Sequence, residues 1–358
     1  MKICRFIMFF SGVICWTFSS SQPPAGYYDS AEGLTGKILQ QELHNIIDNH
    51  TVIPYADLYN SFRLTDVRND SIVWDMYSDR PGGTPAYLYF YGKGQECGNY
   101  NSEADCYNRE HSFPKSWFND GIPMLSDLFH LYPTDGYVNN RRANYPFGET
   151  KNPSWTSTNG SKTGPCSFPG YSGIIFEPVE DYKGDFARTF FYMAVRYFGE
   201  DGSWAGSDMV TGAEPKSWAK NLLLSWHRKD TVSMKEVKRN NAVYHFQKNR
   251  NPFIDQPRLA EKIWGLPDAS VAVINDEPGL ELYPNPASDY LNIRMNGKFP
   301  VHRVVVLYSV SGVLVNQFLM NQEILKVETG GLHAGMYQVS VISKEGVFTG
   351  FFRKVNDR

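Results

Sequence analysis

Apolar residues recur at helical spacing in several parts of the chain. In Leu34 to Ile47 they stand three or four positions apart, which predicts an amphipathic helix. Asp57 to Phe62 adds a shorter helical segment after Pro54. Asp185 stands where a helix N-cap is expected, just before a long apolar run. Four later segments have the same helical character: Phe186 to Phe198, Trp218 to His227, Ser233 to Gln247 and Pro257 to Trp264.

The middle of the chain is less regular. Ile72 to Tyr77 and Ala86 to Tyr91 are rich in aromatic and β-branched residues and are predicted as strands. Loops should dominate Gly92 to Pro178, which is dense in glycine, proline, asparagine and serine, with one helix near Gly136 to Asn144. A long irregular region is usually functional or disordered, and its many aromatic residues argue against disorder.

The pattern changes again after Gly265. Residues 267–279 are small and acidic and indicate a linker between a domain of residues 22–266 and one of residues 280–358. From Leu280 onward the chain alternates as strands do, for example in "RVVVLYSVSGVLV", which predicts a small antiparallel β-sandwich. The expected fold class is therefore α+β.

The N-terminus has the pattern of a secretory signal. Lys2 and Arg5 precede a mostly apolar run that ends in three serines, so residues 1–21 are expected to be a signal peptide. That run is too short to span a bilayer, and no later segment is long and apolar enough to be transmembrane. The mature protein is expected to be exported and to act as a monomer. A hydrophobic content of 42% excludes wholesale disorder.

Three cysteines remain after the signal. In an oxidising compartment Cys97 and Cys106 are close enough in sequence to close a short loop, and we expect a disulfide between them. Cys166 is then left over. Three scattered cysteines provide too few soft ligands for a zinc site.

Charge is spread unevenly along the chain. The formal net charge is −3, which does not indicate a nucleic-acid binder. From Pro215 through Arg258, however, ten lysines or arginines stand against three acidic residues, and a looser basic run includes Arg141, Arg142, Lys151 and Lys162. These residues are compatible with phosphate contacts and equally with solvated helix faces.

Two polar stretches contain residues suited to phosphodiester chemistry. "REHSFPKSWF" holds Glu110 and His111 before Pro114, and "DLFHLYPTDGYVNNRRANYPFGE" follows at Asp127. Histidine has the right intrinsic pKa to deprotonate water, whereas carboxylate and amide oxygens bind hard divalent cations. Because neighbouring side chains of an extended segment point in opposite directions, Glu110 can face a metal while His111 faces the substrate.

These two stretches resemble the endonuclease I family of ββα-metal (His-Me finger) nucleases. The resemblance continues in "YKGDFARTFFYMAVRY" and "RNNAVYHFQKNRNPFIDQPRLAEKIWG" and spans about Gly33 to Gly265. It implies that His111 is the general base and that Glu110 and Asn139 bind the metal, with Asn140 as the alternative ligand. It also implies Mg²⁺, or another divalent cation such as Ca²⁺ or Mn²⁺, and cleavage of DNA and often RNA that leaves 5′-phosphates.

One feature departs from the family pattern. Some members carry a transition-state arginine between the Glu-His motif and the Asp-Leu motif, but Phe118 to Leu125 is short and has no arginine. Arg142 is the first candidate for the cation that clamps the phosphate, followed by Lys115 and Arg109.

Other polar and aromatic residues of these stretches are open to two interpretations. Asp127 is expected to orient the site, and His130 either does the same from a buried position or binds zinc. Asn144 is expected either to support the site or only to fix a turn. Trp117 suits base stacking or core filling. Arg239, Asn249 and Arg250 are expected either to contact phosphates or to bridge helices.

The end of the chain resembles a second family. "LYPNPASDYLNI" and the later "GMYQVSV" and "FFRKV" are similar to the type IX secretion sorting domain of Bacteroidota. The resemblance implies export through the outer membrane by the type IX secretion machinery, to the medium or the cell surface.

Two rival functions remain open at this stage. One is a non-catalytic secreted binding or adhesion protein, which would carry the same sorting module. The other is a zinc hydrolase that uses His111 and His130, although the chain has no HExxH run.

Overall fold

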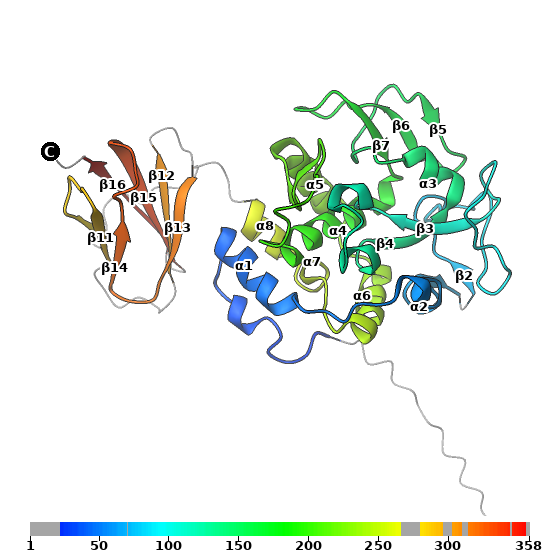
Figure 1. The fold of residues 1–358 in the computed structure, drawn as a ribbon, viewed down its shortest axis with the longest axis horizontal. Helices are drawn as coiled ribbons and strands as arrows, with labels where there is room; N and C mark the ends of the chain where they lie inside the picture. The colour runs from blue at the N-terminus through cyan, green and yellow to red at the C-terminus, as the bar shows by residue number, and fades with distance from the viewer. Residues whose placement is uncertain are drawn as a thin grey trace, which may run out of the picture.

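The computed structural model describes residues 22–265 apart from residue 70, and residues 280–355 apart from 296–302, 310–313 and 344–345. Figure 1 shows a larger body of helices with short strands and a smaller body of strands, which confirms the α+β class. The predicted signal of residues 1–21 and the predicted linker of residues 267–279 lie outside the described residues.

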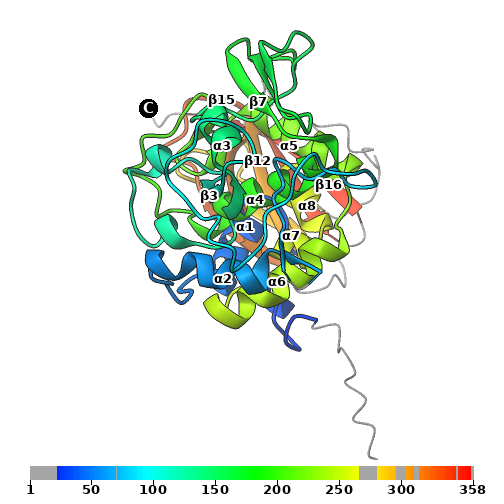
Figure 2. The same cartoon turned by 90° about the vertical axis from the view of Figure 1, so that its right-hand side faces the viewer.

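Helix α4 is the centre of the larger body, and all 14 of its residues are buried (Figure 2). The predicted helices are confirmed within one to three residues at most ends. The α-helices are α1 (Gly36–Ile47), α2 (Leu58–Thr65), α3 (Gly136–Arg142), α4 (Lys183–Arg196), α5 (Ser217–Lys229), α6 (Met234–Gln247), α7 (Pro252–Asp255) and α8 (Arg258–Trp264). In the described part of the chain, 3₁₀ turns accompany them: η1 (Asp29–Ala31), η2 (Tyr55–Asp57), η3 (Lys115–Phe118), η4 (Met124–Ser126) and η5 (Glu180–Tyr182).

The predicted N-cap of α4 is wrong. The helix begins at Lys183, three residues before the predicted start, so Asp185 lies in its first turn and uses its carboxylate to pair with Lys235 at 2.7 Å. By contrast, α6 begins one residue after its predicted start, and there Ser233 forms a capping box with Glu236.

The two strands predicted before residue 92 are largely absent. Only β2 (Ile72–Val73) forms, paired with β1 (Val67–Arg68), and the segment Ala86 to Tyr91 contributes a single bridge at Phe90. The reason is local, because Asp75 Oδ1 accepts a hydrogen bond from the backbone N–H of Tyr77 and fixes a turn there.

The smaller body consists of two antiparallel sheets, as predicted for the C-terminal region. Their strand orders are β10-β11-β14 and β13-β12-β15-β16, and a core that includes Leu291, Val305, Val341 and Phe352 lies between them. The strands are β10 (Leu280–Tyr283), β11 (Tyr290–Met295), β12 (Arg303–Ser309), β13 (Leu314–Met320), β14 (Ile324–Glu328), β15 (Gly335–Ser343) and β16 (Gly346–Lys354). Among the described residues, no helix combines the length and apolar character that a bilayer crossing requires.

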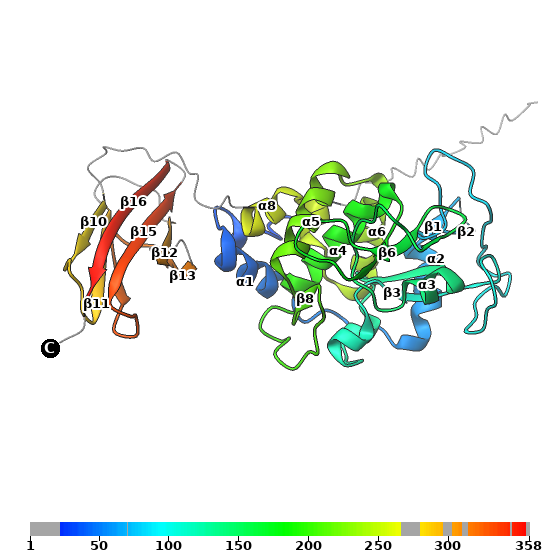
Figure 3. The ribbon, with the colours of Figure 1, turned by 90° about the horizontal axis from the view of Figure 1, so that it is seen from above.

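A strand–strand–helix unit stands beside α4 in the larger body (Figure 3). Strands β3 (Tyr107–His111) and β4 (Leu131–Asp135) pair antiparallel, with Glu110 opposite Tyr132, and α3 follows β4 directly. Asp135 caps α3 by accepting a hydrogen bond from Val138 N–H at 2.8 Å. The remaining strands are β5 (Trp155–Thr156), β6 (Lys162–Pro165), β7 (Ile174–Glu177), β8 (Val210–Thr211) and β9 (Glu214–Pro215).

Several basic residues of the 215–258 region are buried ion-pair partners. Arg239 pairs with Asp66 at 2.8 Å, and Arg250 pairs with Asp255 at 2.7 Å. Asn249 is buried as well and donates to Ile47 O. These side chains bridge elements of the fold, so the alternative in which they contact phosphate is wrong.

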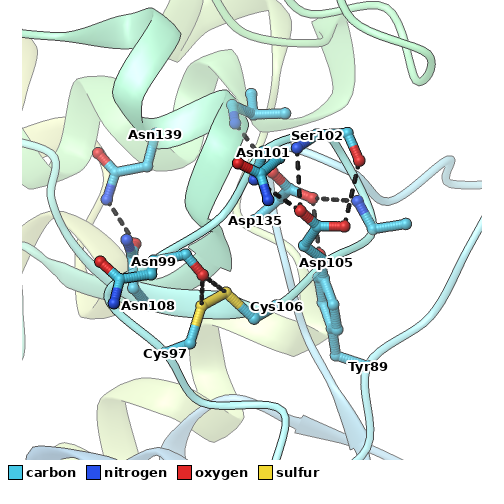
Figure 4. The surroundings of a disulfide bond; sticks show 12 residues. Tyr89, Cys97, Asn99, Asn101, Ser102, Asp105, Cys106, Asn108, Asp135 and Asn139 are labelled. Carbon is cyan, nitrogen blue, oxygen red and sulfur yellow. Dashed lines mark hydrogen bonds between the residues drawn. A yellow bond between two sulfur atoms is a disulfide. The ribbon is translucent and has the colours of Figure 1, made fainter.

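The predicted disulfide between Cys97 and Cys106 is present, with its Cα atoms 5.8 Å apart, and Cys166 is free (Figure 4). The cross-link closes a loop with a sequence separation of 9. We expect a Cys97→Ser/Cys106→Ser variant to lose about 2–3 kcal/mol of unfolding free energy, because the open loop gains entropy in the unfolded chain. Urea denaturation would measure this loss. The Cys166→Ser variant is the matched control, and an equal loss in that variant would contradict the prediction.

Candidate active site

Strand β3 presents two different faces. Asn108 and Glu110 contact residues of α3, whereas Arg109 and His111 contact Tyr55 on the other face. The alternation follows from the period of two along a strand. The sequence predicted that Glu110 and His111 point to opposite faces of the strand. In the structure α3 lies on the Glu110 face and Tyr55 on the His111 face.

The Glu110 carboxylate is held from two sides and is only 2% exposed. Tyr77 donates a hydrogen bond to its Oε1 at 2.7 Å, and Arg142 Nη1 lies 3.5 Å from the same oxygen. Burial raises the pKa of Glu110 above its ordinary value, against the opposing effects of Arg142 and of the Tyr77 hydrogen bond. Because both contacts fall on Oε1, Oε2 is the oxygen suited to a cation.

Asn139 lies on the first turns of α3 and is oriented by a neighbour on β3. Its Nδ2 donates to Asn108 Oδ1 at 2.7 Å, which turns its own Oδ1 away from Asn108 (Figure 4). Helix α3 is itself fixed, because the Asp135 carboxylate at its N-terminus also accepts from Tyr89 and from Ala104 N–H. The Asn139 amide oxygen is thus available as a hard ligand on the face of α3 that meets Glu110's strand.

The imidazole of His111 has a defined tautomer. Its Nε2 lies 3.1 Å from the carbonyl oxygen of Leu125. Since a carbonyl only accepts, Nε2 carries the hydrogen, and Nδ1 keeps its lone pair in the neutral ring. Burial, and after it the charge of His130, lowers the pKa of His111 to about 3, so the ring is neutral near pH 7. Nδ1 is therefore the ring nitrogen of neutral His111 that can accept a proton.

The strand ends immediately after this histidine. Ser112 donates both its backbone N–H and its hydroxyl to His130 O, and Pro114 then starts the η3 turn. The break that the sequence shows at Pro114 is thus the point where the chain leaves β3.

Arg142 does not have the geometry of a phosphate clamp. Its side chain is 1% exposed, and its guanidinium donates to His111 O at 3.2 Å and to Ser112 O at 2.6 Å. Together with its approach to Glu110, these contacts make Arg142 a buried link between α3 and the end of β3. The sequence could not show this, because burial of the side chain depends on packing between elements distant along the chain.

The other two cations are accessible. Arg109 is half-buried, with its guanidinium 4.0 Å from the centre of the Tyr55 ring and donating to Tyr55 O at 3.1 Å. The Tyr55 ring in turn lies nearly parallel to the His111 ring, with centroids 6.1 Å apart. Lys115 is exposed and pairs with Asp120 at 2.9 Å. Both positive charges act on His111, because each contributes to its lowered pKa.

The remaining predicted residues fall into two groups. Asp127 and His130 are fully buried: Tyr192 and Tyr197 both donate to Asp127 Oδ2, and His130 Nε2 contacts Met124 O. Burial alone would raise the pKa of Asp127, but His50, His130 and its hydrogen bonds lower it to about 2. These two residues hold the loop that carries the Leu125 carbonyl. Asn140 and Asn144 are exposed.

Trp117 is buried against Phe113 and Phe190, so it fills the core and does not present a free face for a base.

The oxygen donors of this site fit a hard divalent cation. Glu110 Oε2 and Asn139 Oδ1 are the ligand types that Mg²⁺ prefers, and two protein ligands leave positions for water and phosphate oxygens. Within the described ranges, the one group of three potential metal-binding side chains is His44, Asp48 and Glu200. Arg196 lies between those carboxylates at 3.0 and 2.7 Å and already supplies the positive charge. His111 and His130 form no such group.

Sequence reasoning missed three supporting contacts of the site. Tyr77 holds Glu110, Asn108 orients Asn139, and the carbonyl of Leu125 fixes the His111 tautomer. Of these three residues, only Asn108 could have been found from the sequence. It stands two positions before Glu110 and therefore on the same face of the strand.

Comparison with known proteins identifies two families. The model described as Endonuclease I matches residues 35–258, and the model described as Secretion system C-terminal sorting domain matches residues 281–352. Among curated proteins, the chain is 37% identical to an extracellular ribonuclease of Bacillus subtilis over 66% of this chain and 78% of that protein. It is 34% identical to an extracellular ribonuclease of Bacillus amyloliquefaciens over the same shares. An Endonuclease-1 of Buchnera aphidicola is 25% identical over 48% of this chain and 58% of that protein.

Proposed function

The chain belongs to the endonuclease I family, and we propose that it is a metal-dependent endonuclease. In this proposal it cleaves DNA and RNA with little sequence preference and leaves 5′-phosphates. That the protein is a nuclease follows from the family itself, and its C-terminal sorting domain accounts for secretion or display at the cell surface. The metal, the base and the products are the proposed part.

The observation that carries the proposal is the contact between His111 Nε2 and Leu125 O. It leaves Nδ1 as the only nitrogen that can accept a proton, at the end of the strand that also carries Glu110. In the proposed reaction, Nδ1 takes a proton from water, the water oxygen bonds to phosphorus, and the bond from phosphorus to the 3′ oxygen breaks. The 3′ oxygen leaves and takes a proton from a solvent water, which gives a 3′ hydroxyl beside the 5′-phosphate. A bound phosphodiester adds a negative charge that favours the imidazolium and so raises the pKa of His111 as the proton arrives.

Glu110 and Asn139 would hold a hard divalent cation, which when bound supplies charge neutralisation at the phosphate and at the leaving 3′ oxygen. Tyr77 and Arg142 keep the Glu110 carboxylate in one orientation for this purpose, and Asn108 does so for the Asn139 amide.

The rival functions are weaker. A purely adhesive protein has no need for a histidine with one fixed tautomer beside two oriented oxygen ligands. A zinc hydrolase based on His111 and His130 lacks a third ligand within the described residues.

Metal dependence tests the proposed function directly. We expect the purified protein to degrade plasmid DNA and RNA in Mg²⁺ and to stop when EDTA is added, because Glu110 and Asn139 alone leave the phosphate charge unbalanced. Gel assays with Mg²⁺, Zn²⁺ or EDTA would show this, and end-labelling would identify the 5′-phosphate. Full activity in EDTA, or activity in Zn²⁺ alone, would contradict it.

The phosphate clamp is best assigned to Arg109, with Lys115 as a second contributor. Arg109 lies on the same face of β3 as His111, and Tyr55 supports it by a cation–π contact. Its guanidinium donates to one protein carbonyl, so further N–H groups remain for phosphate oxygens.

A pair of arginine variants separates the clamp from the structural link. We expect Arg109→Ala to lower kcat/KM by roughly 100-fold with little change in stability, since it removes one charged donor from the transition state. Arg142→Met should lower the free energy of unfolding by about 3–5 kcal/mol, because it leaves Glu110 buried without its cation. Kinetics and urea denaturation of both variants would check this. If Arg142→Met is stable but inactive and Arg109→Ala is fully active, the phosphate clamp is Arg142 and not Arg109.

A further inference from the structure

A hollow of about 510 Å³ opens beyond the C-terminal end of α3. It is separate from the site above, because neither Glu110, His111 nor Asn139 lines it. Its lining residues are Asn144, Tyr145, Pro146, Tyr171, Ile174, Ser207 and Asp208. The lining is mostly aromatic and apolar, and its only charged side chain is Asp208.

Two aromatic rings give the hollow flat walls. Tyr145 is 39% exposed and is the one aromatic residue among the exposed large hydrophobic side chains described in residues 22–265. Tyr171 lies on the indole of Trp218, with centroids 4.6 Å apart and planes 10° from parallel. Asp208 fixes both partners, because it accepts from the Tyr171 hydroxyl at 3.1 Å and, through its backbone oxygen, from Trp218 Nε1 at 3.0 Å. The Tyr171 ring is therefore held in one orientation before any ligand arrives.

Both walls are attached to elements that carry the candidate active site. Tyr145 follows α3 and stands six residues after Asn139, so at most about 20 Å of chain separates the two residues. On the other side, Gly206 N–H donates to Trp117 O at 3.0 Å and joins the Ser207–Asp208 segment to η3. Helix η3 begins four residues after His111. The hollow and the candidate active site are therefore connected through the same two elements, α3 and η3.

The chemistry of the hollow suits a base and not a phosphate. Aromatic faces stack on any nucleobase, and the Asn144 amide and the Asp208 carboxylate can meet the polar edge of a base. The Asp208 charge would repel a phosphate. In a duplex, the faces of the bases are already stacked on their neighbours, so only an unpaired base can enter. We propose that this hollow binds an unpaired nucleobase of the strand being cut and favours single-stranded RNA or DNA over duplex.

This inference deepens the proposed function and rests on it. A kinetic comparison tests it with the full chain. We expect Tyr145→Ala to raise KM for a single-stranded oligonucleotide by about fivefold to 100-fold, because one stacked base is lost. The value of kcat, and both constants for duplex DNA, should stay unchanged. Tyr145→Trp should restore the KM. The matched control is Tyr290→Ala, since Tyr290 is 40% exposed on β11, in the other body. Equal losses on both substrates, or no loss on either, would overturn the inference.

A second measurement does not depend on catalysis. The full chain carrying His111→Ala is irradiated in EDTA with a single-stranded oligonucleotide that contains 5-bromouridine, and the cross-linked peptides are mapped. Cross-links at Tyr145 or Tyr171, lost in the Tyr145→Ala background, are the expected result. Cross-links confined to other residues would overturn the subsite, even if the protein is a metal-dependent nuclease. If instead the wild type cleaves nothing but the cross-links appear as expected, the proposed function fails and the binding site stands.

Discussion

The His111→Ala variant is expected to lose about 100-fold to 10,000-fold in cleavage rate on both DNA and RNA, the usual contribution of a general base. The physical reason is that His111 lies at the end of β3 with Nε2 engaged by Leu125 O, which leaves Nδ1 as the ring nitrogen that can accept a proton. Single-turnover cleavage in Mg²⁺, followed beside DNA affinity, would measure the effect. Affinity should change little, since the ring contributes no charge to binding.

The matched control for this variant is His245→Ala. His245 is an exposed histidine on α6, and no contact joins its side chain to the strand–strand–helix unit. Near-normal activity in that control beside an inactive His111→Ala would support the assignment. If His111→Ala cleaves at the wild-type rate, His111 is not the base and the water must be activated elsewhere.

The second large effect concerns the neighbouring asparagines of α3. We expect Asn139→Ala to raise the Mg²⁺ concentration needed for half-maximal activity by at least about tenfold and to lower the maximal rate, because one of two protein ligands is removed. Asn140→Ala should behave like the wild type. Asn140 is exposed, whereas Asn139 is oriented by Asn108, so the pair decides between the two alignments of the metal motif.

Titration of cleavage against Mg²⁺ provides the measurement for both variants. The reverse result, with Asn140→Ala impaired and Asn139→Ala normal, would move the ligand by one position. An Asn108→Ala variant adds a graded test. It should raise the Mg²⁺ concentration needed for half-maximal activity less than Asn139→Ala does, because the Asn139 amide remains and is only freer to rotate.

The sequence predicted the parts of this protein that depend on local patterns. Helix periodicity located the main helices, with the start of α6 predicted within one residue. The order of motifs indicated Glu110, His111 and Asn139 as one site. The sequence failed to predict the local structure where a side chain forms hydrogen bonds with backbone groups outside its own helix or strand. The Asp75 carboxylate fixes a turn where a strand was predicted. Arg142, which was predicted to contact phosphate, is buried and donates hydrogen bonds to the carbonyl oxygens of His111 and Ser112.

Exposure of the cations could not be predicted for the same reason. Arg109, Arg142 and Arg239 look alike along the chain, yet one lies half-exposed against Tyr55 and the others are buried beside carboxylates. Which arginine remains free for substrate is settled by tertiary packing, which periodicity and composition do not encode.

The contact between Arg142 and Glu110 also constrains how this family can evolve. A buried cation and a buried carboxylate compensate each other, so a descendant that loses Glu110 would keep an uncompensated guanidinium in its core. Selection for stability of the fold would then favour replacement of Arg142. In a lineage that abandoned catalysis and kept the fold for adhesion, the two positions should therefore change together. Replacement of Arg142 would then indicate lost catalysis, even though this side chain is buried.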